Sequence, residues 1–153
     1  MTDQKYVLET LRRAGKSAAA QIQTAAQDMT GTQIYAEDGY IPDFKAAAER
    51  KNMLERAVGF VCKSSAGRVV RLLQPYDSSV YPQDPEELPA QWGFVWSTDP
   101  EKALPFIALG TSPYATGDCC TEGGHVWRSK MDNNTWNPNE YPSGWEDLGE
   151  VTR

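Results

Sequence analysis

The sequence predicts an α+β protein in which an N-terminal helix or helices precede two small three-stranded antiparallel β modules. Helix-forming residues with helical apolar spacing dominate up to residue 56, whereas short runs rich in Val and Trp, separated by Gly and Pro, begin at Val58. The second part also repeats its own pattern. We therefore expect a helical segment for oligomerisation or attachment at 1–56, a first module at 57–110 and a second module at 111–153.

Composition limits the possible partners. The 153 residues are 24% charged and 40% apolar, with a formal net charge of −6, and this balance is typical of a globular chain. Nucleic acids and anionic membranes bind basic patches, so the negative charge argues against both as partners. The chain lacks an apolar run near the roughly 20 residues that cross a bilayer and lacks the order of a signal peptide. We expect a product made in a cytoplasm.

The first predicted helix spans residues 4–29. Small and apolar residues alternate at spacings of three and four, which places them on one helix face as a heptad seam. The seam consists of Leu8, Leu11, Gly15, Ala18, Ile22, Ala25 and Met29. Because Gly and Ala bury little area, this helix needs a partner, which is either a second copy of the chain in a homo-oligomer or another part of the same chain. Thr30 and Gly31 indicate its end.

The elements that follow are shorter. Residues 31–43 look irregular because they contain Asp-Gly and Ile-Pro turn signals, and Asp43 is a suitable N-cap for a second helix over 44–56. Beyond it the sequence predicts short strands joined by long Pro-rich loops. The expected strands are 58–63, 68–74, 93–97, 119–121 and 125–130.

The β part repeats the order strand, Gly turn, strand, Pro-containing loop and Trp, which indicates a duplicated unit. Aligning the two copies places Val70 on Trp127, and the closing residues are Trp92 and Trp145. A unit of about 40 residues is near the limit of independent stability. We expect Trp92 and Trp145 to form the cores of their modules, because one indole supplies a large apolar area.

Residues that could carry catalysis or bind a metal are sparse. The three Cys cannot complete a disulfide framework and lack zinc-ligand spacing, so we expect small buried side chains and neither a metal nor a cofactor. His125 is the single imidazole and stands in a Gly turn. The acidic pairs Glu86-Glu87 and Glu146-Asp147 look like solvated surface charge. The sequence therefore predicts that the protein is not an enzyme.

The second module carries a set of motifs in a fixed order: an aromatic residue, Gly-Asp at the first strand, a Gly turn into a strand ending in an aromatic, a polar loop and a closing Trp. These motifs are Tyr114, Gly117-Asp118, Gly124-His-Val-Trp127 and Trp145. This pattern resembles the small chitinase-type carbohydrate-binding modules. The polar segment after the second strand departs from that family, because its aromatic arrives later, at Trp136.

A wider set of motifs covers about residues 35–149. It includes Ile41-Pro42-Asp43, Leu72-Leu73-Gln74-Pro75-Tyr76-Asp77, Leu88-Pro89-Ala90-Gln91-Trp92, Thr98-Asp99-Pro100-Glu101-Lys102-Ala103 and Gly110-Thr111-Ser112. These motifs are similar to those of a group of bacteriophage and prophage tail-associated proteins, in which two such modules follow a helical N-terminal segment.

The resemblance implies non-catalytic modules that bind glycan through surface aromatics. It also implies a component of the virion tail, made in the bacterial host cytoplasm, whose partners are a polysaccharide or cell-wall glycan and other tail proteins. The alternative is a purely structural tail or baseplate protein whose modules mediate protein–protein contacts.

A sugar site combines an aromatic ring, which lies against the C–H face of a pyranose, with short polar side chains for its hydroxyls. The loop 132–137 supplies both, and we expect Trp136 to stay exposed because a loop Trp among polar neighbours is difficult to bury. The alternative is a turn whose Asn and Asp residues bond to their own backbone. The candidate ligand-binding residues are Trp136, Asn133, Asn134, Tyr141, Tyr114 and Trp127.

Overall fold

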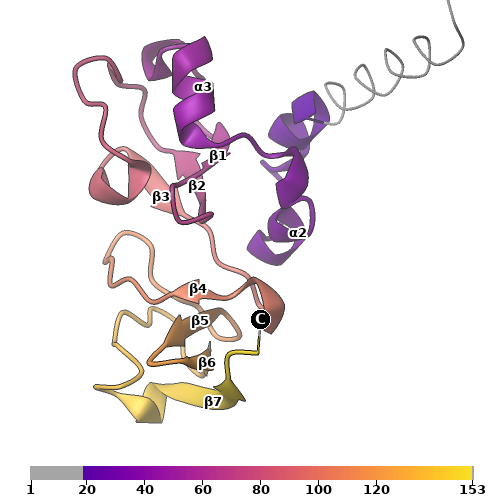
Figure 1. The fold of residues 1–153 in the computed structure, drawn as a ribbon, viewed down its shortest axis with the longest axis vertical. Coiled ribbons are helices and arrows are strands. Elements are labelled where there is room, and N and C mark those ends of the chain that lie inside the picture. Colours follow the sequence, from indigo (N-terminus) through magenta and orange to yellow (C-terminus); the bar gives the residue numbers. More distant parts are fainter. Residues whose placement is uncertain (1–18, 153) are drawn as a thin grey trace, which may run out of the picture.

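The computed structural model describes residues 19–152, which form helices beside two β-sheets that lie one above the other (Figure 1). Residues 19–25 are helical, and two further α-helices follow, α2 (Gly31–Ala36) and α3 (Phe44–Arg50). Single-turn 3-10 helices occupy the connections. They are η1 (Asp38–Tyr40), η2 (Met53–Glu55), η3 (Pro85–Glu87), η4 (Pro100–Lys102) and η5 (Pro142–Gly144).

The first sheet is a three-stranded antiparallel meander, as expected for the first module. Its order is β1-β2-β3, with β1 (Val61–Lys63), β2 (Val69–Leu72) and β3 (Trp92–Phe94). The second sheet has four strands in the order β4-β5-β6-β7. They are β4 (Leu104–Pro105), β5 (Cys119–Glu122), β6 (His125–Ser129) and β7 (Trp145–Glu150). The α+β class is therefore confirmed.

The second sheet fits the expected three-stranded antiparallel module only in part. Strands β5, β6 and β7 are antiparallel, but the expected strand number is wrong, because β4 adds a fourth strand that pairs with β5 in parallel. The strand β4 comes from residues 104–105, within the connection that was expected to be a loop. Its Pro105 cannot donate a hydrogen bond to a ladder, and it is tolerated because β4 lies at the edge of the sheet. A strand that begins before residue 111 thus belongs to the second sheet.

Two expectations about the helices are also wrong. Residues 31–43 are not irregular, because Thr30 caps α2 with a reciprocal capping box: its hydroxyl accepts from the Gln33 N–H, and the Gln33 side chain accepts from the Thr30 N–H. Thr30 therefore starts a helix. The helix expected over 44–56 ends at Arg50, and Asp43 occupies its N-cap position without a side-chain hydrogen bond.

The described end of the first helix packs on the chain's own first sheet. Ile22 and Ala26 are buried in a cluster that includes Val61, whereas Ala25, an expected seam residue, is exposed. The Gln23 side-chain amide donates to the Val61 carbonyl oxygen at 2.8 Å and accepts from the Val61 N–H at 2.9 Å. It thus satisfies backbone groups on the open edge of β1. Here the partner is the same chain.

The remaining seam positions Leu8, Leu11, Gly15 and Ala18 lie outside the described residues. A homo-oligomer formed through the N-terminal helix therefore stays a prediction.

The internal repeat is visible in the backbone hydrogen bonds of the two sheets. The N–H of Gly59 donates to the carbonyl oxygen of Leu72 at 2.8 Å, and the N–H of Gly117 donates to that of Ser129 at 2.9 Å. Both glycines have a positive φ, 95° and 97°, a conformation that other residues rarely adopt. A glycine with the same conformation and the same backbone hydrogen bond thus precedes each meander.

The closing tryptophans occupy equivalent places, as the alignment of the repeat predicts. Trp92 starts β3 and Trp145 starts β7, and both indoles are buried, at 0% and 2% exposure. Each meets the edge of a phenylalanine ring at nearly a right angle. The ring centroids are 5.8 Å apart for Phe44 and Trp92 and 6.0 Å apart for Phe106 and Trp145. The prediction that each indole forms the core of its module is confirmed.

The equivalence extends to a parallel partner at the first edge of each sheet. Asp43 forms a parallel bridge with Lys63 of β1, and Pro105 of β4 pairs in parallel with Thr121 of β5. Lys63 and Thr121 are equivalent in the repeat alignment. Each unit therefore consists of a parallel edge segment followed by a three-stranded meander.

The two sheets share one hydrophobic core. Trp96, just after β3, stacks on Tyr114, just before β5, with ring centroids 4.1 Å apart and planes 15° apart. Tyr114 in turn contacts the edge of Trp145, at 5.3 Å. The Trp96 indole N–H donates to the Ser112 carbonyl oxygen at 3.1 Å. A continuous chain of rings therefore connects the first sheet to the second.

A buried arginine adds a polar link between the sheets. The Arg68 guanidinium donates to the Pro105 carbonyl oxygen of β4 at 2.8 Å and lies over the Trp96 ring at 5.3 Å. Its Nε also lies 3.5 Å from a carboxylate oxygen of Glu86, whose other oxygen accepts from the Ser64 hydroxyl. Glu86 was expected to be solvated surface charge, and that expectation is wrong because the carboxylate pairs with this buried cation.

Gly31 allows a stability test of the contact between α2 and the segment after β3. A Cβ atom at Gly31 would lie 1.9 Å from the Trp96 carbonyl oxygen, whereas one at Gly39 would have no heavy atom within 4 Å. We expect Gly31→Ala to lower the free energy of unfolding by about 1–3 kcal/mol through overpacking, as measured by urea denaturation. The control Gly39→Ala should change it by less than about 0.5 kcal/mol. Equal effects would contradict this packing.

Candidate functional site

The loop between β6 and β7, residues 130–144, presents two exposed aromatic side chains. Trp136 is 54% exposed and Tyr141 is 38% exposed. Their rings meet edge to face, with centroids 5.8 Å apart and planes 84° apart. The prediction that Trp136 remains exposed is confirmed. The pair offers an indole face to solvent beside a phenol, which is the kind of surface that can stack on the C–H face of a sugar ring.

The backbone of Trp136 is held from both sides. Its N–H donates to the side-chain oxygen of Asn134 at 3.1 Å, and its carbonyl oxygen accepts from the buried Trp145 indole N–H at 2.8 Å. Asn134 is itself fully buried, and its amide donates to the Ser129 hydroxyl at 3.0 Å and to the Gly144 carbonyl oxygen at 3.1 Å. The exposed indole therefore stands on an ordered base, which reduces the entropy lost when a ligand binds.

The polar residues of the loop divide into two roles. Asn134 and Asn137 bond to the backbone of this same loop, as the turn interpretation predicts. Asn133 is exposed, has a φ of 55°, and makes no side-chain hydrogen bond to another described residue. Asn133 can thus offer its amide to a ligand hydroxyl.

Two of the expected ligand-binding residues are removed from the site by burial. Tyr114 is 1% exposed and Asn134 is 0% exposed. Tyr114 serves the core, where desolvation raises the pKa of its hydroxyl. Asn134 positions the loop from below. Neither side chain can touch a ligand in this structure, so the prediction that they bind a ligand is wrong and neither belongs to the candidate site.

Trp127 lies on β6 and is half buried. Its indole N–H donates to the Glu122 carbonyl oxygen at 3.1 Å across the β5–β6 turn, and its ring packs against the shared core. The candidate surface therefore consists of Trp136, Tyr141 and Asn133, with Trp127 as a partly exposed neighbour on the same module.

The three cysteines are buried and unpaired, as the sequence predicts. Burial raises the pKa of the Cys62 and Cys120 thiols, so they remain protonated at neutral pH. Within residues 19–152, no group of three or more His, Cys, Asp or Glu side chains is arranged to hold a metal ion. Over the same residues, no helix combines the length and apolarity needed to cross a membrane.

Comparisons of the chain with protein-family models, with curated proteins and with solved structures found no match. The resemblance to carbohydrate-binding modules and to tail-associated proteins therefore remains a prediction from the motifs.

The single histidine, at the start of β6, is paired across β6 and β7. The His125 Nδ1 lies 2.9 Å and 3.1 Å from the two Asp147 carboxylate oxygens. This hydrogen bond raises the pKa of His125 and lowers that of Asp147. Because a raised His pKa stabilises the fold below the unfolded pKa, the contribution of His125 is lost as the pH rises through the folded pKa. That of Asp147 is lost as the pH falls through its lowered pKa.

We expect Asp147→Asn to lower the pKa of His125 towards the ordinary value of about 6.5, because the anionic partner is removed. An NMR titration of the imidazole resonances checks this without ambiguity, since the chain has one His. The control Glu146→Gln should leave the titration unchanged. An unaltered His125 pKa in Asp147→Asn would contradict the pair.

Proposed function

We propose that this chain is a non-catalytic carbohydrate-binding component of a phage or prophage tail that contacts a cell-surface glycan through its second module. The observation that carries the proposal is the exposed Trp136 indole on a backbone fixed by Asn134 and Trp145. Contiguous exposed apolar surface marks ligand-binding and interaction sites more often than a single exposed side chain does, and here two aromatic rings are exposed side by side. The motifs that resemble tail-associated proteins supply the biological setting.

The chemistry of the loop matches a pyranose. The face of the Trp136 indole can stack on the C–H side of the sugar ring, and the Tyr141 ring contacts the indole edge to face. The free amide of Asn133 can both donate to and accept from sugar hydroxyls. Attachment to other tail proteins and homo-oligomer formation are assigned to the N-terminal segment, which leaves the loop at the opposite end of the chain for the glycan.

A glycan array tests the proposal. We expect Trp136→Ala to weaken binding to the glycans recognised by the parent protein by at least about tenfold, because removing a central stacking ring typically costs more than about 1.4 kcal/mol. Trp136→Phe should retain part of the binding, since a smaller ring still stacks. Tyr40→Ala removes an exposed tyrosine (48%) that lies outside the module, and this control should bind like the parent.

The structural alternative gives a different result. If Trp136 forms a contact with another tail protein, the parent binds no glycan, and Trp136→Ala weakens co-assembly instead. Full glycan binding by Trp136→Ala would likewise overturn the assignment of the site.

A further inference from the structure

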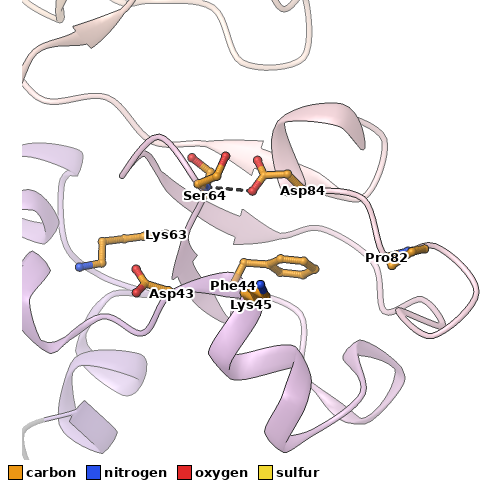
Figure 2. A pocket seen from close by; sticks show the side chains of 8 residues that line it. Asp43, Phe44, Lys45, Lys63, Ser64, Pro82 and Asp84 are labelled. Carbon is orange, nitrogen blue, oxygen red and sulfur yellow. Dashed lines mark hydrogen bonds between the residues drawn. The ribbon is translucent and has the colours of Figure 1, made fainter.

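The first module contains a groove between α3 and the loop that follows β2. Two adjoining hollows of about 470 Å³ and 300 Å³ share Phe44, Lys45 and Pro82 as lining residues. Figure 2 shows the Phe44 ring extending from α3 towards the segment that carries Pro82, with Asp84 above the ring. This groove could not be predicted from the sequence, because its walls come from three separate segments.

The groove lies on the connection that corresponds to the Trp136 loop. In both units the connection after the middle strand bonds to the indole N–H of the buried closing Trp: the Tyr76 hydroxyl accepts from Trp92 at 3.0 Å, as the Trp136 carbonyl oxygen does from Trp145. Both connections also expose an aromatic ring. Tyr81, next to Pro82 of the groove, is 54% exposed, as Trp136 is.

The groove presents charges of both signs. Asp43, Lys45 and Lys63 line it, and their side chains make no hydrogen bond or ion pair with the other described residues. Asp84 is already engaged, since its two oxygens accept from the N–H groups of Ser65 and Glu86. Over both hollows, two Lys stand against three carboxylates, those of Asp43, Asp84 and Glu49, so the lining has no excess positive charge that would select an anionic ligand. It offers donors and acceptors together, which suits a polyhydroxylated neutral molecule.

We propose that the first module is a second carbohydrate site, which takes a neutral oligosaccharide in this groove with Tyr81 stacking at its rim. The inference rests on the proposed function and extends it, because that function assigns the glycan contact to the second module alone. One chain then holds a glycan at two points. Tethered sites of this kind can raise the affinity for a surface by about 10²–10⁴ over one site.

The test compares four full-length proteins on an array of neutral and anionic saccharides at dense and sparse printing: the parent, Tyr81→Ala, Trp136→Ala and the double variant. We expect Tyr81→Ala to lose at least about tenfold in apparent affinity for neutral saccharides at dense printing, through loss of stacking and of the second attachment. The double variant should lose all binding. Calorimetric titration with a neutral saccharide that the parent binds on the array should give two sites per chain for the parent and one for Tyr81→Ala.

Matched variants separate the groove from general surface effects. Lys45→Ala removes a donor that lines both hollows and should weaken the first-module site. Lys51→Ala, just past the end of α3 and outside both hollows, should not. Circular dichroism of Tyr81→Ala should match that of the parent, since the ring is exposed.

The outcomes distinguish this inference from the proposed function. If the chain has one site, Tyr81→Ala binds like the parent and Trp136→Ala loses all binding, the groove site is overturned and the Trp136 site stands. Binding that depends on Tyr81 but not on Trp136 supports the groove and overturns the Trp136 site. Exclusive binding of anionic saccharides, or no neutral saccharide bound by the parent, overturns the groove proposal.

Discussion

The stack of Trp96 on Tyr114 is the contact on which the rest of the structure depends. Each sheet is too small to bury much apolar area by itself, and the two rings lie face to face between the end of one meander and the start of the next. Tyr114 also contacts the ring of Trp145, and the Arg68 guanidinium lies over the ring of Trp96. Two marginal units thereby acquire a common core, which neither could form alone.

That core also orders the surface that we assign to recognition. The indole of Trp145 belongs to the shared cluster, yet its N–H holds the carbonyl oxygen of Trp136. The corresponding indole of Trp92 holds the Tyr76 hydroxyl in the other unit. Core formation and loop geometry are therefore coupled through one polar atom of each closing tryptophan. The same frame supports a projecting ring pair in one unit and a groove in the other, because only the connections differ.

The α+β class, the meanders and the repeat could be predicted, because hydrophobic runs and Gly turns mark them locally. The capping box of Thr30 and Gln33 was also a readable signal for α2. In contrast, β4 is two residues long and contains a Pro, and in β7 two exposed acidic residues follow the buried Trp145, so neither has a strand-like pattern. At the candidate site, the exposure of Trp136 followed from its polar neighbours. The burial of Tyr114 could not be predicted, because the rings that cover it are distant in sequence. The burial of Asn134 could not be predicted either, because its hydrogen-bond partners meet only once the turn has formed.

The parallel edge segment of each unit has a consequence for how such a chain can grow. Asp43 and Pro105 precede their meanders in the sequence and pair with the first strand of each. Each repeat therefore brings the segment that pairs with its own first strand, and it needs none from the preceding copy. A gene segment encoding one unit can be gained or lost in tandem with its sheet complete. The aromatic junction and the Arg68 link to the neighbouring copy must then be adjusted.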